Sequence, residues 1–209
     1  MCGIIAALTQ DINLKKYILN GLQKLEYRGY DSAGYAYLDT SEQLQYHHTT
    51  KSISSLPTQT DNAHSLCAIA HTRWATHGGA TTNNAHPHHS HEQLAIVHNG
   101  IIENHHTLKE ALNKKMPISW RSETDSEVIA HSIYYYQQYE KTTIEEAIRR
   151  TCETLQGSYA LAIINKKRPN TLFTICHESP LLLGKAPNGF FIASDPVALQ
   201  ETTTEMLRL

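Results

Sequence analysis

The sequence predicts an α+β protein in which antiparallel sheets pack face to face and helices cover them on the outside. Apolar runs of strand length gather toward both ends of the 209 residues, whereas helical periodicity occupies the middle. The last quarter adds short apolar runs separated by the turn signals KKRPN, ESP and KAPNG, which is typical of an antiparallel meander. Strand-rich ends around a helical middle favour layered sheets with helices outside.

The first half of the chain is expected to form one helix and several strands. Apolar residues recur at helical spacing over residues 14–25, behind Asn13, a residue type that caps helices well. Runs of strand composition lie at residues 3–8, 35–38, 44–48, 66–71 and 94–98. The last two of these runs end in a histidine and lead into polar loops, where functional sites are usually built.

The second half is expected to begin with helices over residues 104–115, 125–139 and 143–155. Thr124 and Glu127 have the spacing of a capping box at the start of the second helix. Short strands follow at residues 159–164, 171–175, 181–183 and 189–193. The final stretch, residues 198–209, shows no further strand and indicates a cut inside or beside something larger.

Composition argues against several classes of function. The chain has 18 basic and 20 acidic residues, a formal charge of −2, and no long basic run, so no nucleic-acid or lipid surface is expected. Its longest apolar runs are far shorter than the roughly 20 residues that span a bilayer. Cys67, Cys152 and Cys176 lie on apolar stretches without CxxC pairing, which favours core positions and a cytoplasmic location.

Cys2 stands apart because it follows the initiator methionine directly. Once Met1 is removed, the thiol lies within a few bonds of a free α-amine, of which roughly one in seven is neutral at pH 7. Such an amine can act as the general base for its own thiol. The alternative is that Cys2 is only a small residue at the start of a strand.

Two polar loops carry further candidates. In HNG, Asn99 and Gly100 are suited to donate hydrogen bonds to an oxyanion, although an NG pair alone is more often a turn. In HTRWATHGG, Arg73 is suited to a bidentate carboxylate contact and Trp74 to covering a cavity. His71, at a strand end, is interpreted as structural.

The stretch NAHPHHSHEQ concentrates His86, His88, His89 and His91 in six positions. Neutral imidazoles bind zinc or nickel, but a closed metal site needs fixed geometry and usually carboxylate or thiolate partners. We interpret the stretch as a polar loop with adventitious metal affinity. No metal and no cofactor are therefore expected.

Several stretches together carry a resemblance that spans nearly the whole chain. They are MCGI at the start, LEYRGYDSAG at 25–34, HTRWATHG at 71–78, NAHPH at 84–88, VHNGIIENH at 97–105, SETDSEVI at 122–129, GSYAL at 157–161, SPLLLG at 179–184 and ASD at 193–195. In these stretches the chain resembles the glutaminase domains of the glutamine:fructose-6-phosphate aminotransferases, which are class II glutamine amidotransferases. MCGI and HNG are shared across class II, whereas YRGYDSAG and HTRWATHG are more specific.

The resemblance implies an N-terminal-nucleophile hydrolase fold, a four-layer αββα sandwich of two antiparallel sheets. Cys2 would attack the side-chain amide of L-glutamine and form a glutamyl thioester, with ammonia as the other product. The other residues to which the resemblance gives catalytic roles are Asn99 and Gly100 in the oxyanion hole, and Arg28 and Gly29 in support of the amino terminus. Those on the substrate side are Arg73 at the carboxylate, Asp125 at the ammonium, Thr76, His77 and His86 in the pocket, and Trp74 as a gate for ammonia.

Three departures from the family accompany this resemblance. Ala6 replaces a glycine usual in the first strand, and His89 and His91 enrich a loop that normally has fewer histidines. The chain also ends at Leu209, so we expect residues 1–209 to be a glutaminase domain truncated before its last strands, without the sugar-isomerase domains.

The resemblance also implies what the whole protein would do. In the full-length protein, the ammonia would be used to aminate fructose 6-phosphate to glucosamine 6-phosphate. The full-length protein is also expected to be a homo-oligomer. If Met1 is retained, the α-amine of Cys2 is part of a peptide bond and cannot act as the base. A non-catalytic glutamine-sensing module is then the alternative function.

Overall fold

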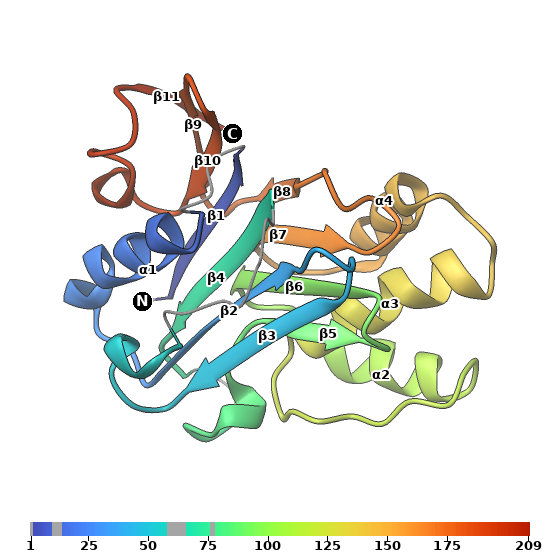
Figure 1. Ribbon diagram of the computed structural model, residues 1–209. Helices are drawn as coiled ribbons and strands as arrows, with labels where there is room; N and C mark the ends of the chain where they lie inside the picture. The colour runs from blue at the N-terminus through green and yellow to red at the C-terminus, as the bar shows by residue number, and fades with distance from the viewer. Residues whose placement is uncertain (1, 10–13, 58–65, 76–77) are drawn as a thin grey trace.

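The protein is described by a computed structural model that covers residues 2–9, 14–57, 66–75 and 78–209. Its layers are stacked in the order helix, sheet, sheet, helices (Figure 1). Helix α1, Leu14–Lys24, packs on the outer face of the first sheet, and α2, α3 and α4 lie on the outer side of the second. This is the αββα arrangement that the resemblance implies.

The first sheet contains, within the described residues, seven strands in the antiparallel order β11-β9-β10-β1-β4-β2-β3. These strands are β1 Gly3–Thr9, β2 Ser32–Leu38, β3 Leu44–Thr49, β4 Cys67–Arg73, β9 Leu182–Ala186, β10 Gly189–Ala193 and β11 Glu205–Arg208. Strand β1 pairs with β10 on one side and with β4 on the other. Cys2, the residue before β1, is therefore held at the end of a central strand.

The second sheet is smaller, with four strands in the order β5-β6-β7-β8 over the described part of the chain. They are β5 His88–Ser90, β6 Leu94–Gly100, β7 Tyr159–Asn165 and β8 Phe173–His177, all antiparallel. The last two residues of β6 lie opposite Ala160 and Tyr159 of β7. This pairing fixes the HNG stretch at the end of a buried strand.

The helices of the second outer layer are α2 His105–Asn113, α3 Glu127–Gln138 and α4 Ile144–Thr154. The hydroxyl of Thr143 caps α4 by accepting a hydrogen bond from the amide of Glu146 at 3.2 Å. Short 3-10 turns complete the described structure at Glu26–Arg28, Ile53–Ser55, Thr82–Asn84 and Pro196–Ala198.

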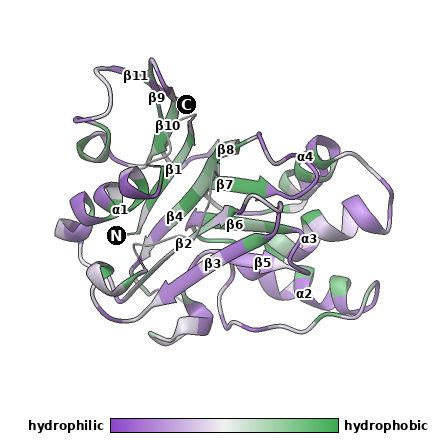
Figure 2. Ribbon diagram, viewed as in Figure 1, coloured by the Kyte–Doolittle hydropathy of each residue, from purple (hydrophilic) through white to green (hydrophobic). Residues whose placement is uncertain are grey.

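Apolar side chains fill each of the spaces between layers. The strands alternate, as β4 shows: Ala68 and Ala70 face α1, whereas Cys67 and Ile69 face the second sheet. In Figure 2 the central strands β1, β4 and β7 are green along most of their length, and the helices carry purple on their outer sides. Since burying one large aliphatic side chain contributes about 1.5–3 kcal/mol, these layers hold the two sheets firmly together.

The strands and helices predicted from apolar patterning all form, with their ends shifted by three residues or fewer. Three other expectations were wrong. Strand β11, Glu205–Arg208, pairs with β9 in the stretch where no strand was expected. His88–Ser90 forms the buried strand β5 rather than a polar loop. The third is the capping box: α3 follows Ser126, which makes no side-chain cap, and the carboxylate of Glu127 instead accepts hydrogen bonds from Ser122 and Arg121.

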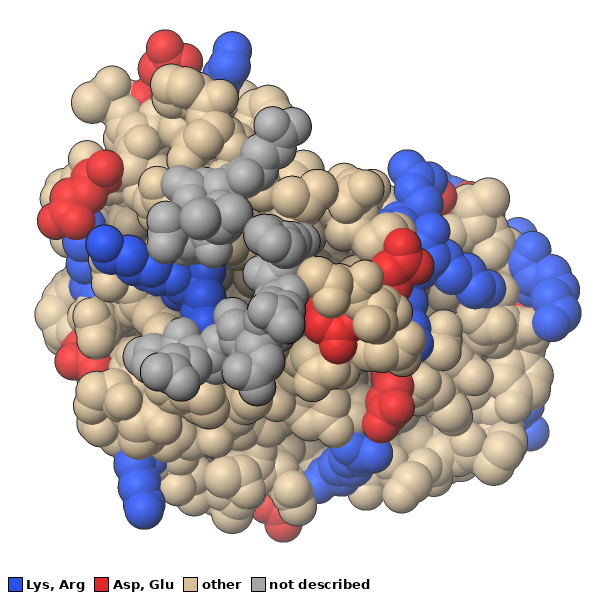
Figure 3. Space-filling view, viewed as in Figure 1, with Lys and Arg blue, Asp and Glu red and all other residues tan. Residues whose placement is uncertain are grey.

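The surface carries no dominant charge on the face seen in Figure 3, where blue and red side chains are scattered among uncharged ones. No helix in the described part of the chain is long and apolar enough to cross a membrane. The helix cap expected at Asn13 lies outside the described residues.

Candidate active site

The thiol of Cys2 lies against the chain that leaves β4. Gly3 pairs with Thr72, so Cys2 comes beside Arg73 and Trp74. The amide of Trp74 donates to Cys2 Sγ at 3.3 Å, and Sγ lies 3.6 Å from the carbonyl oxygen of Trp74. The sulfur is thus fixed by backbone groups of the HTRWATHGG stretch.

Arg28 and Gly29 support this end of β1 from the turn after α1. The Arg28 guanidinium donates to the carbonyl oxygen of Cys2 at 3.3 Å and forms an ion pair with Asp195. Gly29 has a φ of +73°, and a Cβ there would lie 2.6 Å from the Trp74 ring. A larger residue at position 29 would therefore displace the indole of Trp74, which lines the cavity described next.

A small cavity opens beside the thiol. It measures about 20 Å³ and is lined by Cys2, Arg73, Trp74, His86, His98, Gly100, Thr124, Asp125 and Ser126. The structure therefore brings together Cys2, Gly100 and four of the predicted substrate-binding residues. A volume of this size admits a water molecule, so an amino acid must widen the cavity on binding, and the half-exposed Trp74 is placed to move.

The HNG stretch ends β6 next to this cavity. Gly100 lines it and has a φ of +133°, and a Cβ at this position would lie 2.0 Å from the carbonyl oxygen of Ser158. Only glycine fits such a backbone. The preceding side chain, Asn99, is turned so that its Oδ1 lies 3.0 Å from Nε2 of His71.

Arg73 and Asp125 give the cavity one positive and one negative side chain, each only 4% exposed. Arg73 donates to the carbonyl oxygens of Gly79 and Gly78 at 3.1 and 3.2 Å, and it lies 3.6 Å from the Asp31 carboxylate. The Asp125 carboxylate accepts a 2.7 Å hydrogen bond from the amide of Ile102. Two opposite buried charges beside one small cavity match the two ends of a zwitterionic amino acid.

Burial sets the protonation of the groups around the cavity. Burial raises the pKa of the Cys2 thiol above its usual value, so the thiol is protonated at neutral pH. Burial also lowers the pKa of His71 to about 3 and that of His86 well below its usual range. With such low pKa values these imidazoles accept a proton poorly at neutral pH, so a nucleophilic Cys2 needs a different general base.

Two predicted residues cannot be placed, and two others near the site were not predicted. Thr76 and His77 lie outside the described residues. The sequence predicted no role for Asp31. Its carboxylate accepts a hydrogen bond from the amide of Ala75 and lies beside the Arg73 guanidinium. Asp31 belongs to the matching stretch YRGYDSAG, which could have pointed to it. Asp195, the partner of Arg28, lies in the short matching stretch ASD, which was an available signal.

Among the residues that the structure describes, no group of three or more His, Cys, Asp or Glu side chains is arranged to hold a metal ion. The histidines of NAHPHHSHEQ are instead used in packing: the His86 ring lies 4.1 Å from that of His71, and His89 stacks at 4.3 Å on Tyr46. His91 stacks on Tyr134.

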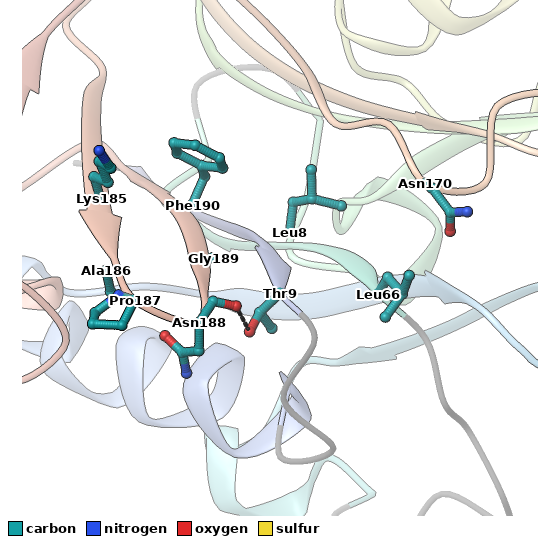
Figure 4. Close-up of a pocket in the computed structure, with 10 residues that line it drawn as sticks. All are labelled: Leu8, Thr9, Leu66, Asn170, Lys185, Ala186, Pro187, Asn188, Gly189 and Phe190. Carbon is teal, nitrogen blue, oxygen red and sulfur yellow. Dashed lines mark hydrogen bonds between the residues drawn. The ribbon is translucent and has the colours of Figure 1, made fainter.

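A much larger hollow, about 580 Å³, lies at the opposite end of β1 from Cys2 (Figure 4). Its lining includes Thr9 and Phe190, and the Thr9 hydroxyl donates to the carbonyl oxygen of Asn188 at 2.7 Å. Lys185 is the charged side chain among the described residues of its lining, so these residues offer neither a thiol nor a pair of opposite charges. The small cavity at Cys2 is therefore the candidate active site.

Comparison with known proteins gives a consistent result. The family model for the glutamine amidotransferase domain matches residues 71–201. The isomerizing glutamine–fructose-6-phosphate aminotransferase of Legionella pneumophila (strain Lens) is 44% identical over 203 residues, which are 96% of this chain and 33% of that protein. The enzyme of the same name from Acidithiobacillus ferridurans is 43% identical and matches 100% of this chain and 34% of its own length. The chain thus spans about a third of the length of these curated relatives.

Solved structures show the same fold. The allosteric regulatory enzyme of purine biosynthesis superposes with a TM-score of 0.82 at 26% identity, covering 99% of this chain and 44% of that one. The glutamine phosphoribosylpyrophosphate amidotransferase of B. subtilis, complexed with ADP and GMP, gives 0.79 at 24% identity, covering 100% and 44%. The predicted N-terminal-nucleophile hydrolase fold, with its two antiparallel sheets between helical layers, is confirmed.

Proposed function

Because the chain belongs to the glutamine amidotransferase family, we propose that it hydrolyses L-glutamine to L-glutamate and ammonia at Cys2. The observation that carries this proposal is the single cavity at which the Cys2 thiol meets Gly100, Arg73 and Asp125. A nucleophile, a donor site for an oxyanion and two opposite charges are the parts that such a reaction requires.

In the acylation step, Cys2 Sγ bonds to the side-chain carbonyl carbon of glutamine and the carbon–nitrogen bond breaks. The thiol proton passes to a base and from there to the departing nitrogen, which leaves as ammonia. The transient oxyanion takes hydrogen bonds from the Asn99 amide and the backbone amide of Gly100. In the second step, water attacks the thioester and releases glutamate and the free thiol.

The base in this proposal is the α-amine of Cys2 after removal of Met1, acting through a water molecule. The raised pKa of the thiol supports the need for such a base, because a protonated thiol is a weak nucleophile. Arg28, through its hydrogen bond to the Cys2 carbonyl, holds this end of the chain in place.

Glutamine would be recognised by its α-carbon substituents. Arg73 would take the carboxylate and Asp125 the ammonium, while Thr76, His77 and His86 would complete the pocket. Trp74 would gate the passage of ammonia, consistent with its half-exposed side chain and its place in the lining of the Cys2 cavity.

The chain would act as the glutaminase part of a longer protein. Relatives about three times as long carry a further region, which we propose to be a sugar-isomerase domain that uses the ammonia to convert fructose 6-phosphate to glucosamine 6-phosphate. Residues 1–209 would then form one glutaminase domain, within a cytoplasmic homo-oligomer in its full-length form.

Intact mass, glutamate release and covalent labelling together test the proposal. We expect a protein that lacks Met1 to release glutamate and to take up one equivalent of a diazoketone analogue of glutamine, and Cys2→Ala to do neither while still binding glutamine. A folded, Met1-free protein that releases no glutamate and takes up no label would refute the activity. If the same protein bound glutamine saturably, it would be the glutamine-sensing module instead.

A further inference from the structure

The side chain of His71 makes a hydrogen bond that joins the two sheets beside the active site. His71 lies on β4 of the first sheet and Asn99 on β6 of the second, and His71 Nε2 lies 3.0 Å from Asn99 Oδ1. Strand alternation explains the direction: in β4, His71 follows Cys67 and Ile69 on the face toward the second sheet.

The chemistry of the two groups fixes which one donates. Nδ1 of His71 is buried and has no hydrogen-bond partner among the described residues, so a proton on Nδ1 would be a buried, unpaired donor. The tautomer with its proton on Nε2 avoids this cost, and its N–H donates to Asn99 Oδ1, which can only accept. Burial lowers the pKa of His71 to about 3, so the ring is neutral and keeps this role throughout the neutral pH range. The ring is fully buried.

This donor selects one of the two orientations of the Asn99 amide. With Oδ1 held by His71, the NH₂ group of Asn99 points away from the ring, and no partner for it is recorded among the residues that the structure describes. In the opposite orientation, an N–H of His71 would face an N–H of Asn99, and Oδ1 would face the developing oxyanion. Both contacts would be repulsive.

We propose that His71 is a positioning residue that keeps the Asn99 amide turned with its N–H groups toward the oxyanion of the reaction. The same hydrogen bond couples the nucleophile to the oxyanion hole, because Gly3, next to Cys2, pairs with Thr72, next to His71. This inference rests on the proposed glutaminase activity. It assigns His71 a part in the rate of the acyl transfer, which the interpretation as a merely structural histidine does not.

The experiment is a double-mutant cycle on glutamine hydrolysis by the Met1-free protein. Removing one oxyanion donor typically lowers kcat by about 100- to 1,000-fold, which sets the expectation for Asn99→Ala. His71→Leu should lower kcat by roughly 10- to 100-fold with KM changed less than about threefold, since the Asn99 amide is present but misdirected. In the Asn99→Ala background, His71→Leu should have no further effect beyond about twofold, because the group it positions is gone.

Alkylation of Cys2 by iodoacetamide separates positioning from general damage. This reaction forms no oxyanion, so its rate should be the same in the wild type and in His71→Leu while kcat falls. A loss of equal factor in both Asn99 backgrounds, or alkylation that slows in parallel with kcat, would overturn the proposal.

Two conservative variants keep the test decisive if His71→Leu does not fold. His71→Gln places an amide donor near the position of Nε2 and should retain kcat within about fivefold, whereas the shorter His71→Asn should not. Equal activity of the two variants would contradict the proposed role. An inactive wild type would instead refute the glutaminase activity, so the two failures are distinguishable.

Discussion

Replacing Gly100 by alanine tests whether the end of β6 must approach β7 as closely as the structure shows. The added Cβ would lie 2.0 Å from the carbonyl oxygen of Ser158 and 2.9 Å from Cα of Tyr159, both backbone atoms that have no rotamer to escape into. Ordinary contacts of a Cβ are 3.4–4 Å long, so the first of these is more than 1 Å too short and the second at least 0.5 Å too short. The φ of +133° adds strain of about 1–3 kcal/mol for a residue with a Cβ.

The expected result is a shift of the Gly100 amide by about 1 Å relative to the Cys2 thiol. A displacement of this size can lower a rate by about 100-fold, and kcat for glutamine hydrolysis should fall by that order. KM should change little, because the proposed carboxylate and ammonium contacts come from Arg73 and Asp125. The strain should lower the melting temperature by roughly 2–12 °C, at about 2–4 °C per kcal/mol for a domain of this size.

Gly189→Ala is the matched control. Its Cβ would lie 2.3 Å from the carbonyl oxygen of Leu8, a comparable backbone clash at the far end of β1. It should lower the melting temperature by a similar amount and leave kcat within about twofold, because it lies far from the cavity. If Gly100→Ala retains wild-type kcat, or if Gly189→Ala loses kcat as severely, the argument from the β6 end is wrong.

Further predictions concern charge and pH. Since the pKa of His71 is near 6.5 in the unfolded chain and about 3 in the fold, the unfolded state binds more protons, and lowering the pH from 7.5 to 5.5 should cost about 1.4 kcal/mol of unfolding free energy through His71 alone. Urea unfolding at the two pH values checks this, and His71→Leu should show a pH dependence weaker by that amount. Asp125→Asn should raise KM for glutamine at least about tenfold in steady-state assays, because the charge proposed to hold the ammonium is lost, and an unchanged KM would exclude that role. Asp195→Asn should reduce kcat several-fold without changing KM, since the Arg28 guanidinium that holds the Cys2 carbonyl loses its ion pair, and the control Glu201→Gln breaks an exposed pair with Lys24 and should leave kcat unchanged.

The elements that the sequence predicted correctly are those whose stability comes from their own apolar pattern. Strand β7, YALAIIN, is buried at every position, and α4 has the spacing of an amphipathic helix with Thr143 before it. Each carries its signal locally. Strand β11, by contrast, is mostly exposed and forms because its backbone pairs with β9, which no local pattern records.

Specific side-chain contacts explain the two other predictions that were wrong. His88 and His89 are polar by composition, yet they are buried in β5, where the His89 ring stacks on Tyr46 and the His88 ring packs against His86. Glu127 has the correct spacing for a capping box, but its carboxylate is satisfied by the amides of Arg121 and Ser122. In both cases the sequence predicted a common use of the residue, and another partner took precedence: a residue distant in sequence for His89, and two amides just before the helix for Glu127.

In the candidate site, too, some features have a local signal in the sequence and others depend on contacts between distant residues. Cys2, Arg73 and Gly100 could be singled out from the sequence because each belongs to a stretch of unusual composition. Asn99 and His71 are 28 residues apart on different sheets, so their hydrogen bond depends on how the sheets stack. That stacking is set by the inner core, where Ala95 and Ala162 of the second sheet face Ala6 and Ile69 of the first.

The alanines at three of these inner positions have a consequence for the chemistry. They allow the sheets to approach closely enough for a side chain on one to reach a side chain on the other, and a close-packed core holds that spacing within narrow limits. The nucleophile is carried by the first sheet and the proposed oxyanion donors by the second. The precision of the site therefore depends on the packing between the sheets as much as on the residues that line the cavity.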